Sequence, residues 1–128
     1  MPIHIDVFHT SRLVIAVVRG AITADEVRDT VLKFMGSDVL HYRKIIDIGS
    51  PTLALDKAGV EAVANLVLAQ SGGKPRGPLA FVVNPGQAAD NAGVFAKLTE
   101  GERPVKVFQS LHRARKWLDE QAPPTILG

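Results

Sequence analysis

Hydrophobic positions along the chain change period several times, and each change marks a new element. Ile3, Ile5 and Val7 alternate with polar residues, which predicts a strand with one buried face. A β-branched run over 12–20 predicts a second strand, and turn-forming residues at 9–11 separate it from the first. The sequence therefore opens with an antiparallel hairpin.

Helical and strand periods alternate through the rest of the chain. Thr23 and Glu26 have the spacing of a capping box, and Ser110 precedes the last apolar helical pattern as a cap. Helices are predicted at about 24–35, 56–70, 87–98 and from 111 onward, and strands at 43–48, 79–83 and 105–108. The order β-β-α-β-α-β-α-β-α requires right-handed crossovers after the hairpin. We therefore expect an α/β fold with a mixed sheet of four to five strands and about four helices.

Length and composition narrow the class of protein. The 128 residues fit one domain, which we expect to span 1–128 with a core at about 3–121 and a tail at 122–128. The lack of cysteine excludes thiol nucleophiles, disulfides and thiolate metal sites. The first residues do not resemble a signal peptide, and no apolar run reaches the roughly 20 residues that cross a bilayer. We expect a cytoplasmic protein without a membrane span.

Charge is nearly balanced overall but uneven along the chain. Fifteen basic and thirteen acidic residues give a net charge of +2, which is too small to require a nucleic-acid partner. The segment 97–116 nevertheless holds six Lys and Arg residues against two Glu residues. This excess fits either an anionic partner or a solvated helix face. The solvated face is the simpler interpretation, because Trp117 is the only aromatic residue in the predicted helix from 111 onward that could stack on a base.

The loop at 49–56 and the helix that follows it form the candidate site. A helix N-terminus after an apolar strand lies at the carboxyl edge of a sheet, where α/β proteins commonly bind ligands. Asp56 is predicted to cap this helix. Lys57 beside it either presents a cation to an anionic ligand or partner or is simply exposed, which is the more common state of a surface lysine. Ser50 and Thr52 are hydroxyls in the same loop that could be modified, although such residues are common in loops.

The helix over 56–70 is apolar around most of its circumference, which a helix on the outside of a sheet does not need. A protein partner, a second copy of the chain or an apolar ligand would cover the excess; alternatively, neighbouring helices bury both sides. Asn84 and Gln87 flank the start of the next helix and add polar groups beside it. The predicted partner-binding residues are Asp56, Lys57, Gly59, Val60, Val63, Val67, Asn84 and Gln87.

The chain resembles the STAS domain, the anti-sigma-factor antagonist fold of bacterial regulators, over nearly its whole length. The resemblance rests on the opening hairpin, the apolar strand through Asp47, and the pattern Val-Phe-x-x-Leu-x-x-Ala-x-x-Trp-Leu over 107–118. In that family the loop before the second helix carries Asp-Ser-[Ser/Thr]-Gly, whose serine is phosphorylated to switch binding of a kinase-type anti-sigma factor. Asp56-Lys57-Ala58-Gly59 stands at that place here. Lys57 replaces the phosphoacceptor, so the family's switch cannot operate at this position.

The resemblance implies a STAS-like protein-interaction or regulatory module that lacks the usual phosphoacceptor. The alternative is a carrier or sensor for a small apolar, lipid-like ligand, because STAS-like proteins are similar to the Sec14 type fold in strand and helix order. The four histidines lie in separate elements without ligand spacing, and no nucleophile and base pair is identifiable. We therefore expect no metal, no cofactor and no enzymatic activity, and a protein partner or homodimer bound through the helix over 56–70.

Overall fold

In the part of the chain that the structure describes, nine helices and strands follow one another in the order that the sequence predicts. The computed structural model describes residues 3–19, 23–35, 39, 41–48, 57–70, 77–84, 86–99 and 103–121. The elements are β1 (Ile3–Phe8), β2 (Leu13–Val18), α1 (Ala24–Met35), β3 (Arg43–Ile48), α2 (Lys57–Gln70), β4 (Leu79–Val83), α3 (Gln87–Leu98), β5 (Val105–Phe108) and α4 (Leu111–Glu120). None of the helices in these segments is long and apolar enough to cross a bilayer.

The five strands form one sheet in the spatial order β1-β2-β3-β4-β5. β1 pairs with β2 antiparallel, and all the other neighbours are parallel. The register places Ile15 beside Ile45 and Ile45 beside Ala80, so apolar residues of successive strands share a face. The expected α/β fold with a mixed sheet and four helices is confirmed.

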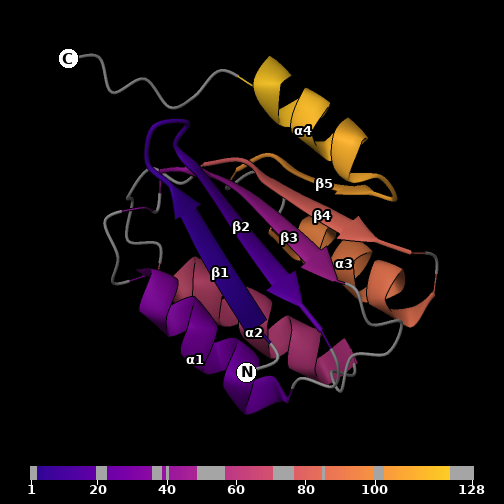
Figure 1. Cartoon of the computed structure of the whole chain (residues 1–128). Coiled ribbons are helices and arrows are strands. Elements are labelled where there is room, and N and C mark those ends of the chain that lie inside the picture. The colour runs from indigo at the N-terminus through magenta and orange to yellow at the C-terminus, as the bar shows by residue number, and fades with distance from the viewer. Residues whose placement is uncertain are drawn as a thin grey trace.

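The helices cover the two faces of the sheet unequally. α1, α2 and α3 lie side by side on one face, and α4 packs alone on the other (Figure 1). Each of the first three helices connects a strand to its next parallel neighbour. The strands are added in one direction across the sheet, so right-handed crossovers place all three connecting helices on the same face. α4 follows the last strand and has no such constraint. It covers β3, β4 and β5, whereas the outer face of the hairpin lies beyond it.

Two hydrophobic clusters hold these layers together. The larger one joins the sheet to the three helices and includes Phe81 and Phe95, whose rings meet edge to face at 5.7 Å. The smaller one joins the sheet to α4 through Ala114 and Leu118, which are 0% and 2% exposed. β4 is buried along its whole length because both clusters meet on it.

Two of the three predicted helix caps lie in the described part of the chain, and both form. The Glu26 N–H donates to Thr23 Oγ1 at 3.2 Å, and the Thr23 N–H donates to Glu26 Oε1 at 3.2 Å. These reciprocal bonds satisfy two amide groups at the start of α1. Ser110 Oγ accepts from the Arg113 N–H at 3.4 Å and so begins α4. The local sequence signals for these two helix starts are therefore confirmed.

Candidate functional site

The sequence placed the site at the carboxyl edge of the parallel strands, and the structure describes part of that edge. Ile48 pairs with Val83, so the chain leaves β3 toward α2 beside the point where it leaves β4 toward α3. Ser50, Thr52 and Asp56 lie outside the described residues. The capping, binding and modification roles expected of these three residues remain predictions.

Four of the remaining predicted residues begin or precede a helix at this edge. Lys57 is the first residue of α2, and Gly59 is half-buried in its first turn. Asn84 is exposed just after β4, and Gln87 is the first residue of α3. The residue before Gln87 is Gly86, which has φ +141°. A side chain would be strained in that conformation, so the bend into α3 requires glycine.

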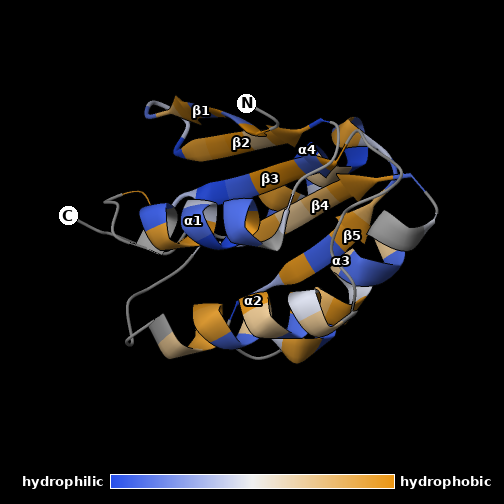
Figure 2. Cartoon of the chain, turned by 90° about the horizontal axis from the view of Figure 1, so that it is seen from below, coloured by the Kyte–Doolittle hydropathy of each residue, from blue (hydrophilic) through white to orange (hydrophobic). Residues whose placement is uncertain are grey.

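The three valines predicted to meet a partner turn toward the interior. Val60 and Val67 are 4% and 2% exposed and belong to the cluster between α2 and the sheet, while Val63 is partly buried against it. Val60 and Val67 therefore form the monomer's core and offer a partner no surface. Figure 2 colours much of α2 orange or pale, in keeping with its apolar composition. The sheet and the flanking helices α1 and α3 pack against this apolar surface.

A pocket lies at the opposite edge of the sheet, where β2 and β3 begin. Its volume is about 240 Å³. The hairpin turn, the start of β3 and the end of α4 supply its walls, and every lining residue is polar or charged: Thr10, Ser11, Arg12, His41, Arg43, Asp119 and Gln121. We call this site the hairpin pocket.

Arg43 is the structural centre of the hairpin pocket. One terminal nitrogen of its guanidinium donates to Asp119 Oδ1 at 2.9 Å, and the other donates to the Ser11 carbonyl at 2.8 Å. The Arg43 side chain is 19% exposed, whereas that of Asp119 is 75% exposed. Arg43 thus ties α4 to the hairpin from a nearly fixed position, while its carboxylate partner remains largely in solvent.

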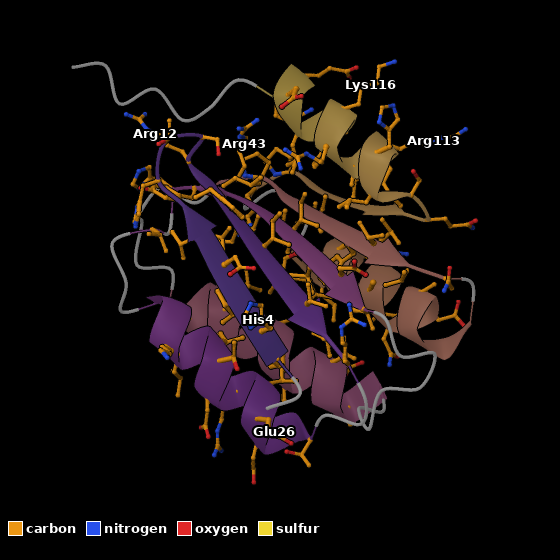
Figure 3. All side chains as sticks on the ribbon, in the orientation of Figure 1. His4, Arg12, Glu26, Arg43, Arg113 and Lys116 are labelled. Carbon is orange, nitrogen blue, oxygen red and sulfur yellow. The ribbon has the colours of Figure 1, made fainter. Side chains whose placement is uncertain are left out.

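Arg12 occupies the last position of the hairpin turn. Its N–H donates to the His9 carbonyl at 3.3 Å, and its φ of +52° is the only positive value among the non-glycine residues that the structure describes. This left-handed residue reverses the chain into β2. Its guanidinium forms no hydrogen bond or ion pair with another described residue. Figure 3 shows Arg12 and Arg43 at the same end of the sheet.

Aromatic contacts support this end of the molecule. His9 Nδ1 lies 2.8 Å from the Tyr42 hydroxyl, and the His9 and Tyr42 rings meet edge to face at 5.7 Å. The His41 ring meets Tyr42 at 4.8 Å in the same way. These contacts connect the hairpin turn to the start of β3, so the two walls of the hairpin pocket are held against each other.

The outer side of α4 carries a second concentration of charge. Arg113, Arg115 and Lys116 are all exposed, and we call them the basic face of α4. Arg113 and Lys116 project away from the sheet in Figure 3. Three of the six basic residues counted over 97–116 are therefore exposed on this helix, which also exposes Asp119 and Glu120 at its end.

Sequence reasoning missed the hairpin pocket for an identifiable reason. Arg43 and Asp119 are 76 positions apart, and no local motif connects them. The turn-forming residues at 9–11 predicted the hairpin, but they did not indicate that Arg12 lies beside the end of α4. Within the described residues, no three His, Asp or Glu side chains converge as a metal site requires.

Comparison with known proteins finds no matching family model, no matching curated protein and no matching solved structure.

Proposed function

We propose that this chain is a STAS-like regulatory module that binds an acidic segment of a partner protein through the basic face of α4. The interaction is non-covalent. Arg113, Arg115 and Lys116 attract and orient the acidic segment, and the buried side of α4 holds them on a rigid base.

The charge order along α4 is the observation that carries this proposal. Cations stabilise a helix near its C-terminus and anions near its N-terminus, by about 0.3–1 kcal/mol each. α4 has the reverse arrangement: Arg113 lies in its first turn, whereas Asp119 and Glu120 end it. No acidic residue lies in the first turn and no basic residue in the last. Asp119 pairs with Arg43, but helix stability does not explain the exposed cation in the first turn, and this supports a role for these cations in contact with an anionic partner.

A protein fits this surface better than a nucleic acid. Trp117, the aromatic residue of α4, is half-buried, and its ring centroid lies 5.7 Å from that of Phe108. Its ring therefore packs within the protein and is poorly placed to stack on a base. The net charge of +2 is also small for a molecule that neutralises several phosphates.

An apolar ligand receives less support from the described residues than a protein partner does. The hairpin pocket is polar throughout, and the apolar side of α2 that suggested a ligand slot is occupied by core packing. The STAS resemblance supports the interaction role, because modules of that family act by binding proteins. With Lys57 in place of the phosphoacceptor, binding by this chain would not be controlled by phosphorylation at that position.

The experiment compares binding of a fluorescent polyglutamate peptide to three proteins by anisotropy. The doubly substituted variant Arg113→Glu, Arg115→Glu reverses two charges on the basic face. Lys33→Glu, on the exposed surface of α1 across the sheet, is the control. We expect the double variant to weaken binding about tenfold and the control to change it little, with wild-type binding falling as salt is raised.

The double variant replaces two cations and Lys33→Glu one, so a loss of binding free energy only about twice that of the control would show that overall charge, not the basic face, controls binding. Tighter binding of double-stranded DNA than of polyglutamate by the wild type would contradict the proposal of a protein partner. Circular dichroism confirms that each variant remains folded.

A further inference from the structure

We propose that the hairpin pocket is a binding site for the phosphate group of a small phosphate monoester. This site is separate from the basic face of α4, and the inference does not depend on whether that face binds a protein. Its residues come from the hairpin turn, the start of β3 and the end of α4.

The pocket presents donors of the kind that bind oxyanions. Arg12 brings a guanidinium that has no partner among the described residues. Thr10 and Ser11 add two exposed hydroxyls, and Gln121 adds an amide at the end of α4. Arginine is suited to this task because its planar fork donates several hydrogen bonds to phosphate or carboxylate oxygens.

A phosphate matches this set better than a carboxylate does. Guanidinium, hydroxyl and amide donors stand on three elements around the pocket, so the ligand must accept hydrogen bonds in several directions. A phosphate monoester presents three acceptor oxygens in a tetrahedral arrangement, whereas a carboxylate presents two in a plane. The volume of about 240 Å³ is below the usual range for drug-sized ligands and suits a small molecule.

Asp119 competes with the proposed ligand for Arg43. Its carboxylate holds one guanidinium nitrogen of Arg43 at 2.9 Å and is 75% exposed. An exposed ion pair is weak, so an incoming phosphate can displace the carboxylate without disrupting the core. Arg43 stays in position meanwhile because the Ser11 carbonyl accepts from its other nitrogen at 2.8 Å. Removal of the charge of Asp119 should therefore strengthen phosphate binding.

The test measures binding of glycerol 3-phosphate and of inorganic phosphate to the full chain at low salt, from amide chemical shifts of residues 9–12. Arg12→Asn removes the unpartnered cation with a residue that tolerates the left-handed conformation. Asp119→Asn removes the competing charge at nearly constant size. Lys33→Gln, on α1, is the matched control for loss of one positive charge.

We expect glycerol 3-phosphate to bind the wild type at least as tightly as inorganic phosphate. Arg12→Asn should weaken binding by about tenfold, Asp119→Asn should tighten it severalfold, and Lys33→Gln should leave it within about twofold of the wild type. If Arg12→Asn fails to fold, the opposite sign expected of Asp119→Asn still tests the site.

Three results would overturn the inference that the pocket binds a phosphate group, and a fourth would overturn the monoester as its ligand. The first is equal weakening by Arg12→Asn and Lys33→Gln, which indicates general attraction to a cationic protein. The second is unchanged or weaker binding by Asp119→Asn. The third is binding of acetate as tight as that of either phosphate compound, which would assign the pocket to carboxylates. Tighter binding of inorganic phosphate than of glycerol 3-phosphate would replace the monoester with the free ion as ligand.

Discussion

Gly77 lies where the segment entering β4 comes close to the backbone of His41 and Tyr42. A Cβ atom at this position would come within 2.6 Å of the His41 carbonyl oxygen and closer still to the carbonyl of Tyr42. Both neighbours are backbone atoms, so they cannot rotate away as a flexible side chain would. The contact holds the segment entering β4 against the segment entering β3, where the Lys44 N–H donates to the Pro78 carbonyl at 2.9 Å.

We expect Gly77→Ala to destabilise the protein by about 3 kcal/mol, because the backbone must shift to accommodate the methyl group. Urea denaturation measures this change. Gly93→Ala is the matched control, since Gly93 is an exposed position of α3 where an added Cβ would meet no neighbouring atom within 4 Å. It should stabilise the protein by about 0.5–1 kcal/mol through higher helix propensity. Equal effects of the two substitutions would contradict the steric explanation.

The helices depend both on capping residues near their ends and on packing against elements that are distant in the sequence. α1 begins with a reciprocal pair of hydrogen bonds between Thr23 and Glu26. α2 shows the opposite case, because its apolar circumference reflects packing on the sheet and between two other helices. α4 keeps Ala114 and Leu118 buried while its outer side is charged. Residues close to its first turn thus determine where such a helix begins, whereas the elements packed against a helix decide which of its sides are buried.

Thr23→Ala should destabilise the protein by about 1 kcal/mol, because it leaves an amide of the first turn of α1 without its hydroxyl acceptor. Thr23→Ser keeps the oxygen and should retain most of the stability. Thermal or urea unfolding of both variants distinguishes the cap from general loss of the side chain. Equal destabilisation by serine and alanine would assign the effect to the lost methyl group rather than to the Glu26 amide.

Among the residues that the structure describes, each helix has one exposed large apolar side chain, and β1 has two, Val7 and Phe8. Leu68 of α2 is 41% exposed, while Leu32, Leu98 and Leu111 on the three other helices are exposed to similar degrees. Isolated exposed leucines are ordinary on a protein surface. The described packing therefore gives α2 no special requirement for a second copy of the chain.

We accordingly expect the purified chain to be a monomer, and Leu68→Glu to leave its mass and fold unchanged. Light scattering coupled to size exclusion measures the mass of both proteins. A wild-type dimer that Leu68→Glu dissociates without unfolding would instead establish α2 as an assembly surface, in agreement with the expectation from its sequence.

The order of elements and the two helix caps could be predicted because each depends on residues close together in the chain. Alternation at Ile3, Ile5 and Val7 identifies a strand, and the spacing of Thr23 and Glu26 identifies a helix start, without knowledge of the fold. Val60 and Val67, which the sequence suggested for an interface, are instead buried in the core of this chain, because hydrophobicity shows that a side chain is covered and not what covers it.

The hairpin pocket depends on distant residues and could not be predicted in this way. Leu13, Ile45 and Leu118 pack in one cluster, and this packing brings Asp119 to Arg43 while the pairing of β2 with β3 places Arg12 beside them. Local periodicity and capping chemistry are properties of short segments, so they are readable along the chain. Strand order, register and helix docking create proximity between segments, and the chemistry of the pocket exists only after that proximity is established.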